Sequence, residues 1–229
     1  MSSIAIIPAR GGSKRIPRKN IIDFCGRPMI AHSIETALSS GLFSEVMVST
    51  DDAEIADIAI KYGAKVPFFR SPQNSDDYAT TADVLIEVLE AYEVNHRFFE
   101  YGCCIYPTAP LAQLPQLEKG FELLCNQQYD SVFPVVSFSY PVWRAITLDA
   151  HNQVAMEWPE YYNSRSQDLK KLYHDAGQWY WFNTNQLKDQ RKLYMNKSFG
   201  LELQEIEVQD IDNMVDLKLA ELKYKLLKS

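Results

Sequence analysis

The sequence is poor in cysteine, and its four cysteines form no recognisable motif. Cys25, Cys103, Cys104 and Cys125 show no metal-ligand spacing, and no His–Cys arrangement indicates a catalytic thiol. We therefore expect reduced, mostly buried thiols, as is usual in a cytoplasmic protein. Cys103 and Cys104 are adjacent in an apolar run, so we expect their side chains on opposite faces of a strand.

Long apolar segments are missing as well. No apolar run approaches the length of a membrane span, and the first residues lack the basic and apolar regions of a signal peptide. We therefore expect a cytoplasmic protein with no membrane partner. An excess of basic residues is also missing, because the formal net charge is −7. This charge argues against a nucleic-acid partner.

The N-terminal loop lacks two familiar phosphate-binding motifs and has a different pattern instead. Without G-x-x-x-x-G-K-[ST] or G-x-G-x-x-G, neither a Walker ATPase nor a dinucleotide-dependent oxidoreductase is indicated. An apolar run at residues 4–7 leads into Gly11, Gly12 and Ser13, and glycine lets backbone N–H groups approach an anion. Five cations lie at positions 10–19: Arg10, Lys14, Arg15, Arg18 and Lys19. The loop predicts a polyanion site, and a solvated basic loop is the alternative.

Short apolar runs alternate with helical patterns along the chain. Strands are predicted at residues 4–7, 45–50, 64–69, 102–106 and 131–138, and helices are predicted between them. This rhythm indicates a single α/β domain, residues 1–229, with a mainly parallel sheet and helices on both faces. Ligands of such sheets bind beyond the carboxyl ends of the strands, where the basic loop, Asp51 and Arg70 are expected.

Residues 139–171 break this rhythm. The segment is aromatic and polar, and residues 143–148 and 153–157 are predicted to form a hairpin. Because aromatic side chains are enriched at interfaces, we expect a contact between subunits; a surface-packed hairpin without a partner is the alternative. A further strand at 178–182 would place Gln178 and Tyr180 on one face, with His174 near its start.

A last strand is predicted at residues 201–208, and after it Asp210 and Asp212 are expected on the same side of an extended segment. Two neighbouring carboxylates repel each other unless a cation lies between them, and Mg²⁺ binds through one or two carboxylates plus substrate phosphates. The alternative is that Asp212 caps the final helix. The apolar face of that helix is predicted to include Val215, Leu219, Leu222 and Leu226.

Motifs spread over nearly the whole chain are similar to those of one enzyme family. They lie at residues 7–20, 48–51, 70–72, 80–81, 106–110 and 210–212. The chain thus resembles the acylneuraminate cytidylyltransferases, also called CMP-sialic acid synthetases. Tyr106 and the sugar-site segment 175–180 depart from the pattern for N-acetylneuraminate, and the segment 175–180 resembles the pseudaminic acid branch. The resemblance implies a Rossmann-like nucleotidyltransferase fold and a homodimer, with residues 139–171 as a dimerisation extension.

The resemblance also implies an activity. CTP and a nine-carbon nonulosonic acid, in this branch pseudaminic acid, would give the CMP-sugar and pyrophosphate with Mg²⁺ or Mn²⁺. Within the same class, N-acetylneuraminate, legionaminate or the eight-carbon acid Kdo is the alternative substrate. A nucleotidyltransferase for sugar-1-phosphates that uses UTP or dTTP is a weaker alternative. A non-catalytic nucleotide-binding protein on the same fold is the alternative from another class.

Site residues follow from the matched motifs. For the nucleotide, the resemblance implies Ala9, Arg10, Gly11, Gly12, Ser13, Lys14, Lys19, Asn20, Arg70, Thr80, Thr81 and Tyr106. For the sugar acid, we expect Thr108, His174, Gln178 and Tyr180, with Arg144 and Arg165 as candidate partners of its carboxylate, either in the same chain or across the dimer. For catalysis, the resemblance implies Arg10, Lys19, Asp210 and Asp212, and the two aspartates are the expected metal ligands. Arg15 and Arg18 lie where the family varies, so we expect them only to be solvated.

Overall fold

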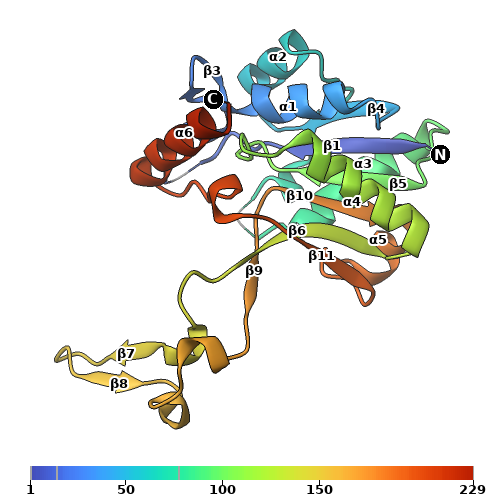
Figure 1. Ribbon diagram of the computed structural model, residues 1–229. Helices are drawn as coiled ribbons and strands as arrows, with labels where there is room; N and C mark the ends of the chain where they lie inside the picture. Colours follow the sequence, from blue (N-terminus) through green and yellow to red (C-terminus); the bar gives the residue numbers. More distant parts are fainter. Residues whose placement is uncertain (1, 14, 77, 229) are drawn as a thin grey trace.

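A central sheet of seven strands organises the chain (Figure 1). The computed structural model describes residues 2–13, 15–76 and 78–228. The strand order is β11-β6-β10-β5-β1-β4, and β9 pairs with β6. β10 runs antiparallel to β5 and β6, whereas β1 is parallel to β4 and β5 and β6 is parallel to β11. The predicted mainly parallel α/β fold is confirmed. The strands are β1 (Ser3–Pro8), β4 (Glu45–Ser49), β5 (Tyr101–Ile105), β6 (Ser131–Ser137), β9 (Tyr173–Asp175), β10 (Trp179–Asn183) and β11 (Ser198–Glu202).

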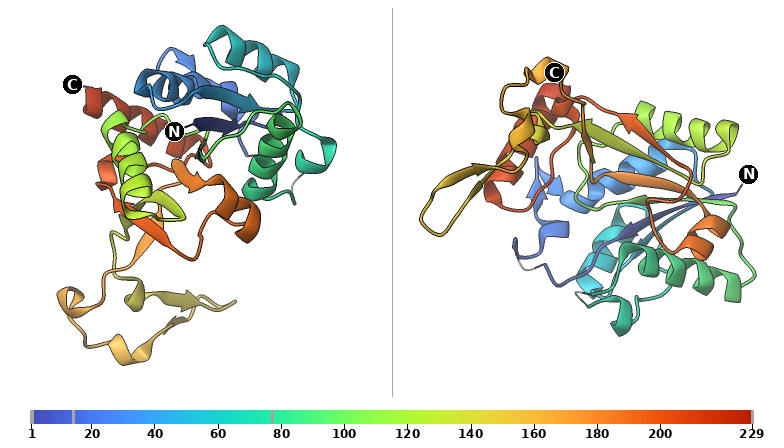
Figure 2. Two further views of the ribbon diagram at one scale, coloured as in Figure 1. Left: turned by 90° about the vertical axis from the view of Figure 1, so that its right-hand side faces the viewer. Right: turned by 90° about the horizontal axis from the view of Figure 1, so that it is seen from below.

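Helices cover both faces of this sheet (Figure 1, Figure 2). α1 (Met29–Ser40), α2 (Ala53–Lys61) and α4 (Leu114–Gln127) pack on one face, and α3 (Thr81–Val94) and α5 (Thr184–Gln190) pack on the other. Side chains alternate between the faces as a pleated strand requires. Cys103 belongs to the first core and Cys104 to the second, which confirms the expectation from their adjacency.

Two helix ends follow from local backbone chemistry. Gly41 follows α1 with φ 63°, a left-handed conformation that glycine adopts without a steric cost. Asp52 caps α2, because its side chain accepts a hydrogen bond from the Ile55 amide. The cap at Asp52 begins α2 directly after β4, and a hydrogen bond from the Gly11 amide to Asp51 brings the N-terminal loop beside it.

Two predicted strands are wrong or shifted. Residues 64–69 form only an isolated bridge between Lys65 and Met47, because Pro67 has no N–H to continue a ladder. The strand expected at 201–208 lies earlier, at β11, and is followed by the 3₁₀ helix η6 (Glu205–Glu207). A capping box between Gln204 and Glu207 fixes that turn and ends the strand.

The last helix, α6 (Met214–Lys228), turns a different face inward than the sequence predicts. Leu217 and Ala220 are buried in a small core with Ile16 and Phe24. The predicted apolar face is wrong: the side chains expected to be buried are exposed, namely Val215, Leu219, Leu222 and Leu226. Capping by Asp212 is also wrong, because the Asn213 side chain accepts from the first amides of the helix.

The aromatic segment projects away from the sheet as an arm (Figure 1, Figure 2). It contains the predicted hairpin, with strands β7 (Ile146–Leu148) and β8 (Val154–Met156), both shorter than expected. Trp143 lies instead in the 3₁₀ helix η3 (Val142–Arg144), against Trp158. The remaining short elements are η1 (Lys19–Ile21), β2 (Asp23–Phe24), β3 (Arg27–Pro28), η2 (Pro72–Asn74), η4 (Pro159–Tyr161) and η5 (Ser166–Asp168). Among the described helices, none is long and apolar enough to cross a bilayer.

Candidate active site

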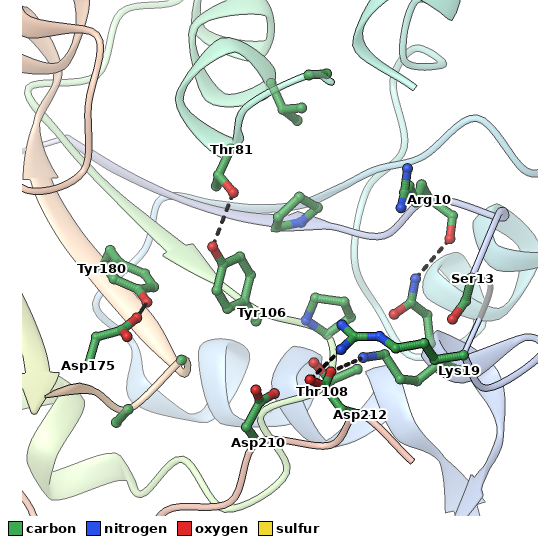
Figure 3. Close-up of a pocket in the computed structure, with 18 of the residues that line it drawn as sticks. Arg10, Ser13, Lys19, Thr81, Tyr106, Thr108, Asp175, Tyr180, Asp210 and Asp212 are labelled. Carbon is green, nitrogen blue, oxygen red and sulfur yellow. Dashed lines mark hydrogen bonds and ion pairs between the residues drawn. The ribbon is translucent and has the colours of Figure 1, made fainter. Parts of the chain in front are cut away.

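A cavity of about 900 Å³ lies beyond the carboxyl ends of β1 and β5. Its walls come from segments far apart in the sequence (Figure 3). The N-terminal loop supplies cations, the segment before α6 supplies two carboxylates, and β9 and β10 supply the far wall. Twelve of the predicted site residues line it: Arg10, Ser13, Lys19, Asn20, Arg70, Thr81, Tyr106, Thr108, His174, Tyr180, Asp210 and Asp212. The predicted Lys14 lies outside the described residues.

The cationic wall is tied to the C-terminal segment. Lys19 Nζ donates a hydrogen bond to the Ile211 carbonyl at 2.7 Å and lies 3.8 Å from a carboxylate oxygen of Asp212. Arg15, which the sequence indicates only as solvated, lines the cavity and forms an ion pair with the same carboxylate. Asn20 does not reach out to solvent; it donates to the Arg10 carbonyl at 2.9 Å and so fixes the start of the loop.

The glycines of the loop have a role that the sequence does not reveal. The Gly11 amide donates to the Asp51 carboxylate at 2.9 Å. A Cβ on Gly11 would lie 2.7 Å from an oxygen of Asp52, whereas one on Gly12 would meet nothing within 4 Å. Neither glycine lines the cavity, and neither does the buried Ala9. Gly11 therefore allows the loop to pack against the start of α2.

Arg18 also joins the N-terminal loop to the start of α2. Its guanidinium donates to both carboxylate oxygens of Asp52 and also pairs with Glu54, so it is not merely solvated. The hydrogen bonds from Arg18 lower the pKa of Asp52. Arg18 thus acts on the structure of the loop and not on the cavity, which it does not line.

Arg70, Thr81 and Tyr106 line another part of the cavity. Arg70 is buried, donates from Nε to the Ser49 hydroxyl at 3.0 Å, and has its pKa lowered by burial. Thr81 Oγ1 lies 3.1 Å from the Tyr106 hydroxyl. Thr80 does not line the cavity, because its hydroxyl caps α3 and donates to Asp83.

The far wall is built from phenols and a carboxylate. The Tyr180 hydroxyl donates to Asp175, and the Tyr106 ring contacts the Tyr180 ring edge to face at 5.5 Å between centroids. Burial raises the pKa of both phenols, so both hold their protons at neutral pH. His174 and Asp175 line the cavity beside them. The sequence marks Asp175 only as the first residue of the segment 175–180 and assigns it no role, and the pairing of β9 with β6 brings it to this wall.

Three predicted sugar contacts do not reach the cavity within one chain. Gln178 is 3% exposed and donates to the Glu207 carbonyl at 2.6 Å, so it ties β10 to η6. Arg144 and Arg165 lie on the projecting arm, and Arg165 pairs locally with Asp168 at 2.7 Å. Neither arginine lines the cavity of its own chain.

The carboxylates of Asp210 and Asp212 lie on one wall of the cavity (Figure 3). Among the described residues, no group of three or more His, Cys, Asp or Glu side chains is placed to hold a metal ion. Two carboxylates suit Mg²⁺ or Mn²⁺ when phosphate oxygens complete the coordination. The donor set therefore fits a divalent ion that arrives with a phosphate ligand.

Comparison with known proteins decides the family. A family model described as Cytidylyltransferase matches residues 4–223. The chain belongs to this family. It is 44% identical to the pseudaminic acid cytidylyltransferase of Campylobacter jejuni over 226 residues, which cover 99% of this chain and 97% of that protein. It is 32% identical to the CMP-N,N'-diacetyllegionaminic acid synthase of Legionella pneumophila, over 96% of this chain and 95% of that one.

The fold of this cytidylyltransferase also matches solved structures. A CMP:2-keto-3-deoxy-manno-octonic acid synthetase complexed with CTP aligns with a TM-score of 0.69 at 18% identity, over 100% of this chain and 99% of that one. At this identity the match supports the fold alone. The resemblance to the acylneuraminate cytidylyltransferases, and within them to the pseudaminic acid branch, is confirmed by the relatives.

Proposed function

We propose that this cytidylyltransferase converts CTP and pseudaminic acid to the CMP-sugar and pyrophosphate. One observation carries the proposal: a single cavity joins a cationic loop, a pair of carboxylates and a wall rich in hydroxyl groups. These are the groups needed for a triphosphate, its divalent ion and a polyhydroxylated acid. The 44% identity with a pseudaminic acid cytidylyltransferase over nearly the full length supports the choice of sugar. CTP and the acid would be the partners, in the cytoplasm, with no membrane or nucleic acid involved.

The reaction is a displacement at phosphorus. The anomeric hydroxyl of the acid attacks the α-phosphorus and releases its proton. A new O–P bond forms, the bond from the α-phosphorus to the bridging oxygen of the β-phosphate breaks, and pyrophosphate leaves with that electron pair. Such transfers depend mainly on positioning and charge neutralisation. Arg10 and Lys19 carry positive charge at the wall where the triphosphate would lie, with Ser13 as a hydrogen-bond donor.

The carboxylate pair would hold the divalent ion. Mg²⁺ or Mn²⁺ on Asp210 and Asp212 would neutralise phosphate charge and make the attacking hydroxyl more acidic. Without a nucleotide, Asp212 is neutralised by Arg15 and Lys19. Binding of the triphosphate would give both cations a phosphate partner and so make the Asp212 carboxylate available.

The nucleoside would lie between the basic loop and α3. Arg70 and Thr81 line this part of the cavity and supply donors for the base, and Tyr106 stands beside Thr81. The backbone from Ala9 to Gly12 is adjacent to it in the chain. Thr108, His174 and Tyr180 would contact the sugar acid from the opposite wall.

Residues 1–229 would form one domain in a homodimer, with residues 139–171 as the dimerisation extension. Apolar side chains on the hairpin are exposed in the single chain, among them Ile146, Leu148 and Val154. A second copy of the chain would bury these side chains and remove the exposed apolar surface. The extension would also carry Arg144 and Arg165 towards the cavity of the partner, where a guanidinium could pair with the acid's carboxylate.

The test is a panel of acids incubated with CTP and Mg²⁺, read out as pyrophosphate. Pseudaminic acid should give the highest kcat/KM among pseudaminic, legionaminic and N-acetylneuraminic acids and Kdo. Turnover with N-acetylneuraminic acid alone would overturn the sugar assignment. Preference for UTP or dTTP with a sugar-1-phosphate would overturn the reaction class. Mass measurement in solution tests the dimer independently of activity.

A further inference from the structure

The segment that carries Asp210 and Asp212 has no regular structure of its own. Residues 208–213 are all described, lie between η6 and α6, and belong to no helix or strand. Both carboxylates nevertheless point into one cavity (Figure 3). A group that binds a ligand has to be held within about 0.5 Å of its working position. Contacts other than those of a helix or a strand ladder must therefore fix this segment.

Two side chains hold consecutive backbone carbonyls just before the carboxylate pair. Gln178, directly before β10, donates from Nε2 to the Glu207 carbonyl at 2.6 Å. Lys223 on α6 donates from Nζ to the Val208 carbonyl at 2.7 Å and to the Glu205 carbonyl at 2.9 Å. The end of η6 and the residue after it are thus tied to the start of β10 and also to the last helix.

Buried apolar side chains anchor the same segment before and after Asp210. Val208 is buried in a small core with Ala176, and Ile211 is buried in another with Leu217 of α6. Between such anchors the peptide units can still rotate, and a rotation there would swing the Asp210 side chain. A peptide unit whose carbonyl is held by a donor cannot turn without breaking that hydrogen bond. The donors to the carbonyls of residues 207 and 208 therefore set the direction in which the chain enters Asp210.

These two donors are separate from the groups that would bind the nucleotide. Lys19 also donates to a carbonyl of this segment, that of Ile211, but Lys19 lines the cavity and would pair with the triphosphate under the proposed function. Gln178 and Lys223 do not line the cavity. They would therefore keep their carbonyl partners when the cations of the N-terminal loop change theirs.

We infer that Lys223 and Gln178 are positioning residues that hold the backbone before Asp210 so that its carboxylate meets the divalent ion. This inference rests on the proposed function. Neither side chain touches the nucleotide, the acid or the ion, because each acts through a backbone carbonyl. Mg²⁺ demands a near-ideal octahedral arrangement of its oxygen ligands. Loss of either donor would let the Asp210 carboxylate move and would weaken the binding of the ion.

The first experiment is a Mg²⁺ titration of pyrophosphate release. Lys223→Met removes the donor, and the half-maximal Mg²⁺ concentration should rise about 10- to 100-fold, the range for loss of a group that orients a metal ligand. Lys223→Arg keeps a donor and should restore most of the loss. Lys218→Met, at an exposed position on α6, is the matched control and should leave the Mg²⁺ requirement unchanged.

The second experiment measures CTP binding by calorimetry without the acid, so it needs no turnover. In EDTA, the Kd for CTP should change by less than about twofold in Lys223→Met, because Lys223 does not line the cavity. Mg²⁺ should tighten CTP binding to the wild-type enzyme, and Lys223→Met should lose most of this gain. If Lys223→Met weakens CTP binding equally with EDTA and with Mg²⁺, the lysine has a merely structural role and the inference is overturned.

Gln178→Met tests the other donor, which comes from a different element. Gln178 Oε1 accepts no hydrogen bond from the described residues, so this variant leaves no buried donor unpaired and should fold. It should raise the Mg²⁺ requirement as Lys223→Met does. An unchanged Mg²⁺ requirement in both variants would overturn the inference and leave the proposed function standing. A wild-type enzyme that releases no pyrophosphate with any nonulosonic acid would overturn the proposed function itself, and the inference with it.

Discussion

Arg15 and Asp212 form an ion pair that joins the N-terminal loop to the segment before the last helix. The two residues are 197 positions apart in the sequence, yet they line one cavity. Lys19 reaches the same carboxylate. Asp212, which the sequence predicts to be a metal ligand, is thus paired with two cations of the predicted phosphate-binding loop. Under the proposed function, ligand binding would exchange partners within this cluster.

Asp212→Asn tests the catalytic part of this cluster. Asn keeps the side-chain shape but is a weaker ligand for a divalent ion and cannot balance two cations. We expect kcat to fall by about 10²–10³-fold, which is the range for loss of one electrostatic contact in a transition state. The midpoint of thermal unfolding should stay within a few degrees. Pyrophosphate release over a Mg²⁺ titration measures the effect, and Asp189→Asn on α5 is the control. A near-normal rate at ordinary Mg²⁺ concentrations would contradict the metal role.

Gly11→Ala and Gly12→Ala separate packing from chain flexibility in the basic loop. The new Cβ at position 11 would lie 2.7 Å from the Asp52 carboxylate, whereas the one at position 12 meets open space. We expect Gly11→Ala to lower the free energy of unfolding by about 1–3 kcal/mol, as overpacking does. Gly12→Ala should change it by less than about 0.5 kcal/mol. Urea denaturation measures the free energy of unfolding of both variants. Equal losses would show that the contact with Asp52 does not determine the cost of the substitution.

Glu45 gives a prediction for pH. Burial alone would raise its pKa, but hydrogen bonds from Arg97, Lys65 and Tyr92 outweigh it and hold the pKa below the ordinary value. A carboxyl with a lowered pKa in the folded state stabilises the protein at neutral pH. That stabilisation is lost as the pH falls below the unfolded value of about 4.3 and through the lower folded value.

Glu45→Gln should therefore lower stability at pH 7 by about 1–3 kcal/mol, because the buried Tyr92 hydroxyl and the two cations lose a charged acceptor. It should also flatten the decline of stability below about pH 5. Urea denaturation between pH 7 and pH 3 measures both effects. Glu118→Gln, at an exposed position on α4, is the matched control. If stability declines equally steeply at low pH in Glu45→Gln and in the wild type, the pH dependence comes from other carboxylates.

Local chemistry made much of the fold predictable. Gly41 and Asp52 mark helix ends through backbone preferences that depend on a few neighbouring residues. The basic loop and the Asp210–Asp212 pair were recognisable because their residue types fit one ligand. Both motifs do line the same cavity, as expected for loops at the carboxyl edge of a parallel sheet.

Features set by distant contacts were not predictable. Asp175 reaches the cavity only through the β9–β6 pairing, and nothing in its local sequence specifies that partner. Gln178 satisfies the simple alternation with Tyr180, but the Glu207 carbonyl draws it away from the cavity. Pro67 could have warned against the strand at 64–69, since proline removes a ladder donor.

The inward face of α6 gives the last prediction, because sequence and structure disagree on it. Leu217 is buried against Ile16 and Phe24, whereas Leu222 is exposed on the opposite side. Leu217→Ala should lower the free energy of unfolding by about 2–5 kcal/mol, the range for a buried leucine. Leu222→Ala should cost less than about 1 kcal/mol in a monomeric state. Thermal and urea denaturation at low protein concentration measure both. A larger loss for Leu222→Ala would mean that α6 packs through the stripe containing Val215, Leu219 and Leu226.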